Sequence, residues 1–153
     1  MKRWLTIFFA LQILLLVSGG AGACSWDRTV TDQEHFREAR SVFIAHVMRT
    51  EEVERSAWDQ EEPMVQATVR VVESFKGLPP ADGKIRSRVF ASGNCSIPIL
   101  AGNNYLIFFL RDDLPVGFTG GSRLLSTLRD DLQEEETKQI LKMLRRLRDD
   151  PSP

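Results

Sequence analysis

The sequence is poor in cysteine and histidine, the residues from which conventional zinc sites are built. Its 153 residues include 2 cysteines and 2 histidines, too few for a zinc site made only of cysteine and histidine ligands. The formal net charge is −1, which excludes a strongly basic nucleic-acid-binding protein. No Ser-His-Asp set or pair of catalytic carboxylates stands out, and residues 117–122 lack the Gly-Lys-Ser/Thr ending of a P-loop. We therefore expect neither an enzyme nor a cofactor, and no nucleic-acid partner.

The sequence has one long apolar run, and it lies at the N-terminus. A short positive start, Met1 to Arg3, precedes an apolar stretch over residues 4–17, and small residues lead to Ala21-Gly22-Ala23. This pattern is typical of a secretory signal peptide with an A-x-A cleavage site. The run is shorter than the roughly 20 residues that a membrane-spanning helix needs. We expect a signal peptide over residues 1–23 and a single domain over residues 24–153. The protein would then be secreted or reach another extracytoplasmic compartment, with no membrane span after signal removal.

Cleavage after Ala23 makes Cys24 the first residue of the mature chain, and this position has three interpretations. Gly22 and Ala23 suit a lipobox, which would place a lipid anchor on Cys24, although Ala21 stands where lipoboxes usually carry a large aliphatic residue. Alternatively, Cys24 pairs with Cys95, the only other cysteine, in the disulfide that an oxidising compartment favours. In the third interpretation the bridged cysteine also offers its free amine and carbonyl to a metal.

The remaining chain has the periodicities of a β-rich domain with flanking helices. Thr31-Asp32-Gln33-Glu34 has capping-box spacing, which predicts a helix to about residue 40. We expect strands over residues 41–50, 65–71, 85–89 and 105–110, a loop over 51–62 and a turn-rich segment over 112–126. In the second strand, Val65, Ala67, Val69 and Val71 alternate with polar residues and should face the core. Val72 breaks the alternation and indicates a bulge or a bend before Phe75.

The C-terminal segment predicts a helix over about residues 131–148, because apolar residues recur there at helical spacing. Acidic residues begin this helix and basic residues end it, as the helix dipole favours. Short strands with bends and two helices suit a small, partly closed Greek-key barrel such as an OB-fold. The predicted fold class is mainly β with flanking helices, an OB-fold-like five-stranded Greek-key barrel plus the C-terminal helix.

Five segments resemble the tissue inhibitors of metalloproteinases (TIMPs), whose N-terminal domain is of the netrin-like type. The segments are the mature start Cys24-Ser25-Trp26, the strand 41–47, the strand 69–77 that ends in Phe75-Lys76-Gly77, the loop 91–95 and the stretch 102–107 with a Gly-x-x-Tyr-Leu-Ile pattern. Their order and spacing match over roughly residues 24–110. The resemblance implies a netrin-like OB-fold and a disulfide between Cys24 and Cys95. The other TIMP disulfides and the C-terminal domain of that family are absent, and Trp26 replaces a family cysteine.

The resemblance also implies a mode of action. In TIMPs the amine and carbonyl of the first residue bind the zinc of a target metalloprotease, so Cys24 would supply backbone ligands to that zinc alone. Ser25 is small enough to enter the substrate pocket, and Trp26 and the loop Ser92-Gly93-Asn94 would lie beside it. An enzyme that uses Cys24 as a nucleophile would need a free thiol, which the disulfide removes. The alternatives are a non-inhibitory extracellular protein-binding module, in which the disulfide only ties down the N-terminus, and a lipid-anchored lipoprotein.

Overall fold

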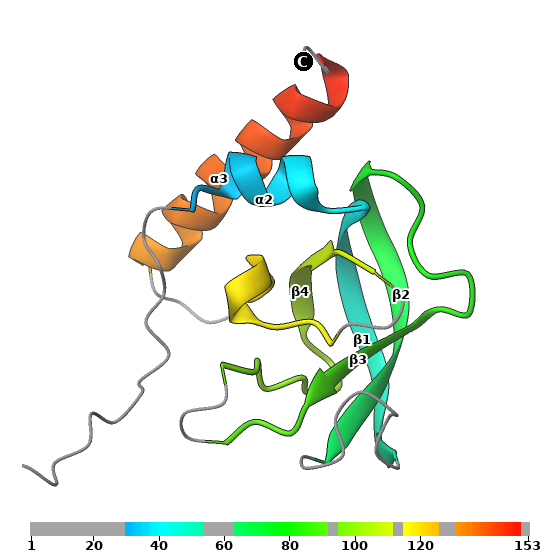
Figure 1. Cartoon of the computed structure of the whole chain (residues 1–153). Helices are drawn as coiled ribbons and strands as arrows, with labels where there is room; N and C mark the ends of the chain where they lie inside the picture. Colours follow the sequence, from blue (N-terminus) through cyan, green and yellow to red (C-terminus); the bar gives the residue numbers. More distant parts are fainter. Residues whose placement is uncertain (1–29, 54–62, 92–94, 112–114, 126–130, 151–153) are drawn as a thin grey trace, which may run out of the picture.

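The computed structural model describes residues 30–53, 63–91, 95–111, 115–125 and 131–150 (Figure 1). It is mainly β, with five strands and two longer helices, as the sequence predicts. The C-terminal helix is also confirmed. The elements in chain order are α2 (Asp32–Glu38), β1 (Ser41–Val53), β2 (Met64–Lys76), β3 (Lys84–Arg88), β4 (Asn104–Phe109), the short 3₁₀ helix η1 (Phe118–Gly120), β5 (Arg123–Leu125) and α3 (Asp131–Asp149).

The strands form one antiparallel sheet in the order β3-β2-β1-β4-β5. The return of β4 to the far side of β1, after the hairpin-connected β1, β2 and β3, is a Greek-key arrangement. The sheet is not closed into a barrel, since the described parts of β3 and β5 do not pair. A backbone hydrogen bond of 2.7 Å from Val116 to the carbonyl of Arg86 joins the segment before β5 to β3. The Greek-key order therefore agrees with the prediction, and the barrel remains open.

Both faces of the sheet are buried over part of their area. One face packs the side chains of β1, β2, β3 and β4 against the 97–99 segment, with Phe43, Ile85, Ile97 and Tyr105 at most 1% exposed. The other face is covered by α2 and α3, which contribute Phe36 and Leu144 to the second cluster of buried residues. The strand β4 has buried residues on both faces, so its unbroken apolar run fits its place inside the sheet.

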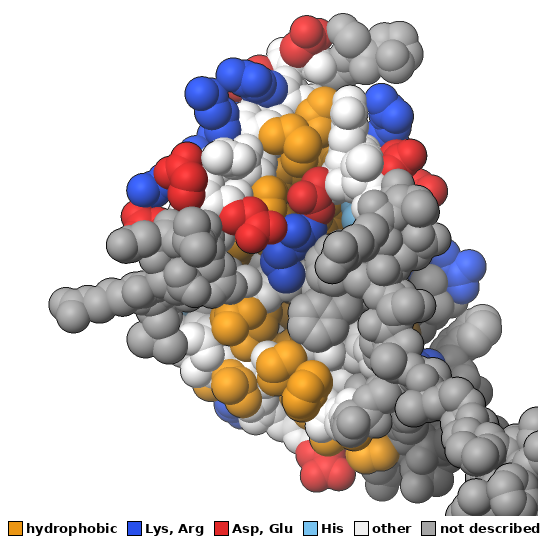
Figure 2. Space-filling view, turned by 90° about the vertical axis from the view of Figure 1, so that its left-hand side faces the viewer, with side chains coloured by type: hydrophobic (Ala, Val, Ile, Leu, Met, Phe, Trp, Pro, Cys, Tyr) orange, Lys and Arg blue, Asp and Glu red, His pale blue; other side chains and the backbone are white. Residues whose placement is uncertain are grey.

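The helix α3 is held to the sheet by Leu144 and by an ion-pair clamp on Glu73. Arg145 donates two hydrogen bonds to the Glu73 carboxylate, of 2.9 and 2.7 Å, and Arg148 donates a third of 3.2 Å. The hydrogen bonds from Arg145 are the main reason why the pKa of Glu73 lies below its ordinary value. The apolar stripe of α3 stays partly exposed. On the face shown in Figure 2, hydrophobic side chains reach the surface above and below a band of charged residues.

Some details of the strands differ from the prediction. β1 continues to Val53 and pairs there with Met64, so the loop predicted to begin at residue 51 is wrong for residues 51–53. Val72 is skipped in the register, between the pairs Ile44–Glu73 and Ala45–Val71, which confirms the bulge. Ala67 and Val69 are buried as predicted, whereas Val71 is 37% exposed. The reason is that β3 pairs only with residues 64–68 of β2 and leaves Val71 beyond its reach.

Two further corrections concern the start of β2 and the chain after η1. Val65 is only half-buried, while Gln66 on the opposite face of β2 is 5% exposed. Gln66 is buried because Glu51 accepts a hydrogen bond from its amide at 2.8 Å and Arg86 donates one to it at 3.1 Å. The predicted turn-rich segment contains the strand β5, which is three residues long.

Candidate functional site around Cys95

Most of the residues that the sequence assigns to the site lie outside the described part of the chain. This holds for the disulfide residue Cys24, the protease-contact residues Ser25 and Trp26, and the loop Ser92-Gly93-Asn94. The pairing of Cys24 with Cys95 and the domain bounds therefore stay predictions. Cys95 itself is described: it is half-buried and has a φ of 51°. This left-handed conformation is uncommon for a residue with a side chain and marks a tightly constrained turn.

Cys95 follows β3 by seven residues, and the chain just before and just after the stretch 90–95 lies together at one edge of the sheet. The hydroxyl of Ser96 donates to the carbonyl of Val89 at 3.4 Å and joins the two ends of the loop. The amide of Val89 donates to the carbonyl of Pro63 at 3.0 Å, so this place is also where β2 begins. Phe90 is 58% exposed on the loop. The sequence analysis did not single out Phe90, although an aromatic residue directly after an alternating strand is a signal that could have found it.

The segment that follows Cys95 is fixed from two sides. Ser96 pairs with Gly117, and Ile97 is buried in the core at 1% exposure. A Cβ on Gly117 would lie 3.2 Å from the carbonyl oxygen of Cys95, so the two backbones are in close contact. Beside them is a cavity of about 260 Å³ whose lining includes Arg88, Cys95, Val116 and Gly117. The loop is thus supported by the same segment, 115–117, that links β5 to β3.

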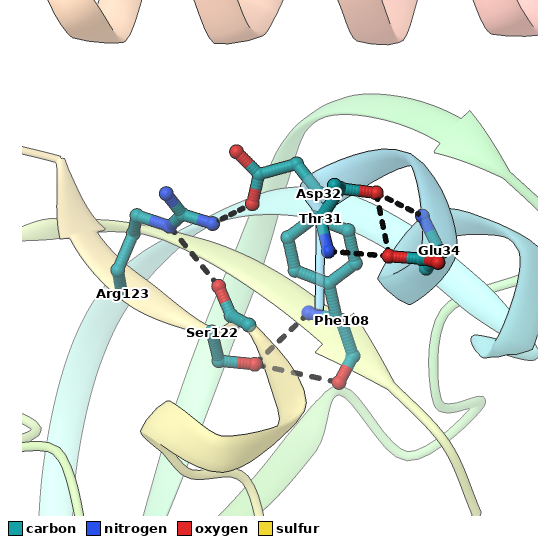
Figure 3. A network of polar contacts seen from close by, with 7 residues as sticks. Thr31, Asp32, Glu34, Phe108, Ser122 and Arg123 are labelled. Carbon is teal, nitrogen blue, oxygen red and sulfur yellow. Dashed lines mark hydrogen bonds and ion pairs between the residues drawn. The ribbon is translucent and has the colours of Figure 1, made fainter. Parts of the chain in front are cut away.

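A polar network holds the start of α2 against β5, close to this segment (Figure 3). Asp32, the first residue of α2, forms an ion pair with Arg123. Arg123 Nε also donates to the carbonyl of Gly121 at 3.1 Å. Ser122 Oγ accepts from the amide of Phe108 at 3.0 Å and donates to its carbonyl at 3.3 Å, which ties the network to β4. These contacts fix the first turn of α2 against β5 and β4.

The capping box at the start of α2 is confirmed. Thr31 accepts a hydrogen bond from the amide of Glu34 at 3.2 Å, and the Glu34 carboxylate accepts one from the amide of Thr31 at 2.6 Å. The backbone hydrogen bond from Thr31 is the main cause of the lowered pKa of Glu34. The capping box therefore fixes the backbone at Thr31, where α2 begins.

The two histidines have packing or hydrogen-bonding roles. His35 is 7% exposed, with its ring centroid 5.9 Å from that of Phe108. A Cβ on Gly121 would lie 2.8 Å from the His35 ring, so only glycine fits beneath it. His46 Nδ1 lies 2.9 Å from Oδ1 of Asn104. Within the described residues, no group of three or more His, Cys, Asp or Glu side chains could hold a metal ion.

The segment Phe75-Lys76-Gly77, one of those that resemble TIMPs, has a structural role here. Phe75 is 3% exposed, and Lys76 Nζ donates to the carbonyls of Phe36 and Arg37 at 2.7 and 2.8 Å. These are carbonyls in the last turn of α2, where a cation is favourable. Burial lowers the pKa of Lys76. The segment therefore locks the end of α2 onto the end of β2.

The stretch from Gly102 to Ile107, a second of these segments, also shapes the fold. Gly102 has a φ of 85°, and its amide donates to the carbonyl of Val47 at 2.8 Å. The Tyr105 hydroxyl donates to the carbonyl of Pro98 at 2.7 Å and accepts from the amide of Leu100 at 2.9 Å. Tyr105 thus fixes the 98–100 segment, which follows Cys95 and Ser96. The Gly102–Ile107 stretch therefore stabilises the chain that follows Cys95, whereas Phe75-Lys76-Gly77 acts at the end of α2.

Comparison with protein-family models and with curated protein sequences finds no match for this chain. Among the helices that the structure describes, none combines the length and the apolar character needed to cross a membrane.

Proposed function

We propose that the mature chain is a secreted TIMP-like domain that inhibits a zinc metalloprotease through the amine and carbonyl of Cys24. The inhibitory edge consists of Cys24, Ser25 and Trp26, with Ser92, Gly93 and Asn94 beside them and the Cys24–Cys95 disulfide between the two segments. Phe90 extends this edge with an exposed aromatic side chain.

The observation that supports this proposal is the position of the start of α2. The Asp32–Arg123 ion pair and the packing of Gly121 under His35 place the start of α2 against residues 121–123. Four residues earlier, Gly117 pairs with Ser96, the neighbour of Cys95. Thr31 lies seven positions after Cys24, and an extended chain over seven positions reaches up to roughly 25 Å. The leading segment is thus long enough to run beside residues 117–123 toward Cys95.

The chemistry follows from the protonation of the N-terminus. An α-amine has a pKa of about 7.7–8.0, so a substantial part of it is neutral near pH 7.5 and can donate its lone pair to zinc. The carbonyl oxygen of the same residue closes a five-membered chelate. Catalytic zinc sites keep one position for water or substrate, and the chelate would displace that water. The disulfide would hold the amine at the protein surface in one orientation.

The test is inhibition by the correctly processed domain and by a form with one alanine added before Cys24. The addition displaces the amine by about 3.8 Å and converts the original nitrogen into an amide, which is a poor zinc ligand. We expect inhibition of a panel of zinc metalloproteases to fall by orders of magnitude while the fold and disulfide are retained. Ser25→Arg should separately change which proteases are inhibited. Equal potency of the two forms would contradict the chelation mechanism.

A second candidate, a non-inhibitory protein-binding module, is favoured by one observation. Phe90 is 58% exposed next to Val89, whose carbonyl accepts a hydrogen bond from Ser96, and an exposed aromatic side chain is a typical anchor in protein interfaces. This candidate needs no free amine. Binding of a partner that persists after the alanine addition and is lost in Phe90→Ser would support it over inhibition.

A further inference from the structure

A groove of about 480 Å³ lies near the other end of β3 from the Cys95 loop. Ile85 and Phe109, which are 1% and 5% exposed, contribute to its lining. Lys84, Arg86 and Leu78 line it as well. None of these residues takes part in the proposed inhibitory edge. The groove combines an apolar interior with charged and apolar groups that remain accessible, which is the composition of a binding site.

The charge of the groove is opposite to that of the whole chain. The chain carries a formal net charge of −1, yet three cations, Arg40, Lys84 and Arg86, line the groove with Asp82 as the single carboxylate. Asp82 accepts a hydrogen bond from the backbone amide of Lys84 at 3.0 Å. Within the described part of the chain, neither Lys84 nor Arg86 has a carboxylate partner. Two positive charges are therefore available to an anionic ligand at an apolar surface.

The groove also presents a large apolar side chain to solvent. Leu78 is 86% exposed, more than any other large hydrophobic residue in the described part of the chain. The chain on either side of it is constrained, because Gly77 is pressed against the carbonyl of Arg40 and Pro79 and Pro80 each fix their own φ. Leu78 therefore projects from a conformationally restricted turn and contacts little of its own protein. Its position suits contact with a partner that extends beyond the groove.

We propose that this groove binds an acidic, extended peptide segment of a partner protein that carries an apolar side chain. The carboxylates of the segment would lie at Lys84 and Arg86, and its apolar side chain would enter between Leu78 and the interior formed by Ile85 and Phe109. A small amphipathic acid would satisfy the same charges. We favour the peptide because a small ligand is normally enclosed by its site, whereas Leu78 stands almost fully in solvent.

The test uses the mature domain and a panel of short fluorescein-labelled peptides in which aspartate alternates with leucine or phenylalanine, measured by fluorescence anisotropy. The reference panel has asparagine in place of aspartate. The variants are Lys84→Glu and Leu78→Ser, and the matched control is Lys142→Glu, an identical charge change on the exposed side of α3. Reversing a charge that contacts a carboxylate should weaken binding at least about fivefold.

The proposal requires that the aspartate peptides bind and that the asparagine peptides bind more weakly. It also requires that Lys84→Glu and Leu78→Ser each reduce the affinity for the aspartate peptides. Lys142→Glu should leave that affinity within about twofold. An equal loss in Lys84→Glu and Lys142→Glu would show unspecific attraction and overturn it. Absence of binding across the panel would overturn it as well. Decanoate serves as the probe for a small amphipathic acid. If decanoate bound with the same dependence on Lys84 while no peptide bound, the groove would be a site for a small amphipathic acid, and the peptide proposal would be wrong. Lys84→Glu should not alter metalloprotease inhibition, so failure of this proposal is separable from failure of the inhibitory function.

Discussion

Gly77 lies so close to Arg40 that no side chain fits between them: a Cβ on Gly77 would stand 2.2 Å from the carbonyl oxygen of Arg40. This contact occurs where the end of β2 passes the end of α2, beside the hydrogen bonds that Lys76 donates to the last turn of that helix. The close approach explains why glycine follows Phe75 and Lys76. It also makes this junction a sensitive point for the position of α2, and hence for the direction of the chain that precedes it.

Gly77→Ala should strongly destabilise the protein. The left-handed φ of 59° costs a residue with a Cβ about 1–2 kcal/mol, and the clash with backbone atoms of Arg40 adds to this because backbone cannot rotate away. Gly102→Ala is the matched control, since Gly102 also has a positive φ but a Cβ there would meet nothing within 4 Å. Urea unfolding should show a much larger loss for Gly77→Ala. Equal losses would mean that the conformation alone, and not the contact with Arg40, sets the cost.

The clamp between Glu73 and α3 should make stability depend on pH in the acidic range. The pKa of Glu73 is lowered from its ordinary value of 4.5, mainly by hydrogen bonds from Arg145. A carboxyl group whose pKa is lower in the folded than in the unfolded chain stabilises the fold above its unfolded pKa, and this stabilisation is lost as the pH falls through the folded pKa. Removing the charge by Glu73→Gln should cost about 1 kcal/mol at pH 7.

The difference between the wild type and Glu73→Gln, measured by urea unfolding from pH 7 to pH 3, should therefore shrink toward the acidic end. Glu134→Gln is a suitable comparison, because Glu134 pairs with Lys138 within α3 and both side chains are 62% exposed. It should shift the unfolding midpoint less. A Glu73→Gln difference that stays constant with pH would show that lost packing, and not lost charge, is responsible.

The facing of β2 can be tested at two neighbouring residues. Val69 is 9% exposed and belongs to the core, while Arg70 is exposed on the opposite side of the strand. Val69→Asp would bury an unpaired carboxylate at a cost of several kcal/mol and should prevent folding, whereas Arg70→Asp should be nearly neutral. Circular dichroism and thermal unfolding of the two variants provide the measurement. Similar damage from both would mean that the strand is oriented differently.

Local patterns predicted the local parts of this fold. The capping box at Thr31 and Glu34 and the bulge at Val72 are written in adjacent residues, and both are present. The burial of Gln66 could not be predicted in this way, because its partners Glu51 and Arg86 are 15 and 20 residues away in sequence. The sequence did not predict β5 for a related reason. The segment from Arg123 to Leu125 is too short to show an alternating pattern, and it forms a strand only because it pairs with β4.

In the candidate site, too, local features were predictable from the sequence and long-range contacts were not. Cys95 and its loop were found because a cysteine and a family resemblance mark them, but nothing in the local sequence shows that Asp32 reaches Arg123, 91 residues away. That contact fixes where α2 begins relative to β5. Leu78 and Lys84 likewise look like ordinary turn residues until the structure places both in one groove. Long-range contacts of this kind arise from the tertiary fold and leave no periodic signal in the sequence.

Replacing Cys95 by serine should lower the stability of the mature protein if Cys24 and Cys95 are paired. The two positions are 71 residues apart in sequence, and a disulfide that closes a loop of this size stabilises by about 4 kcal/mol in the chain-entropy model. Thermal unfolding of Cys95→Ser with and without reductant should give the same low melting temperature, whereas the wild type should fall to it only under reduction. An intact mass that includes a diacylglyceryl group on Cys24 would contradict the disulfide and favour the lipoprotein.

The last prediction separates the two proposed binding surfaces by exchanging one exposed apolar residue on each. Phe90 and Leu78 are 58% and 86% exposed, and each contributes little to the core, so Phe90→Ser and Leu78→Ser should change the free energy of unfolding by less than about 0.5 kcal/mol. Phe90→Ser should weaken metalloprotease inhibition by at least about tenfold, as expected for an aromatic anchor at an interface, and leave binding of acidic peptides unchanged. Leu78→Ser should do the opposite. If both variants weakened both activities, one surface would serve both partners, and the assignment of separate sites to the Cys95 loop and the β3 groove would be wrong.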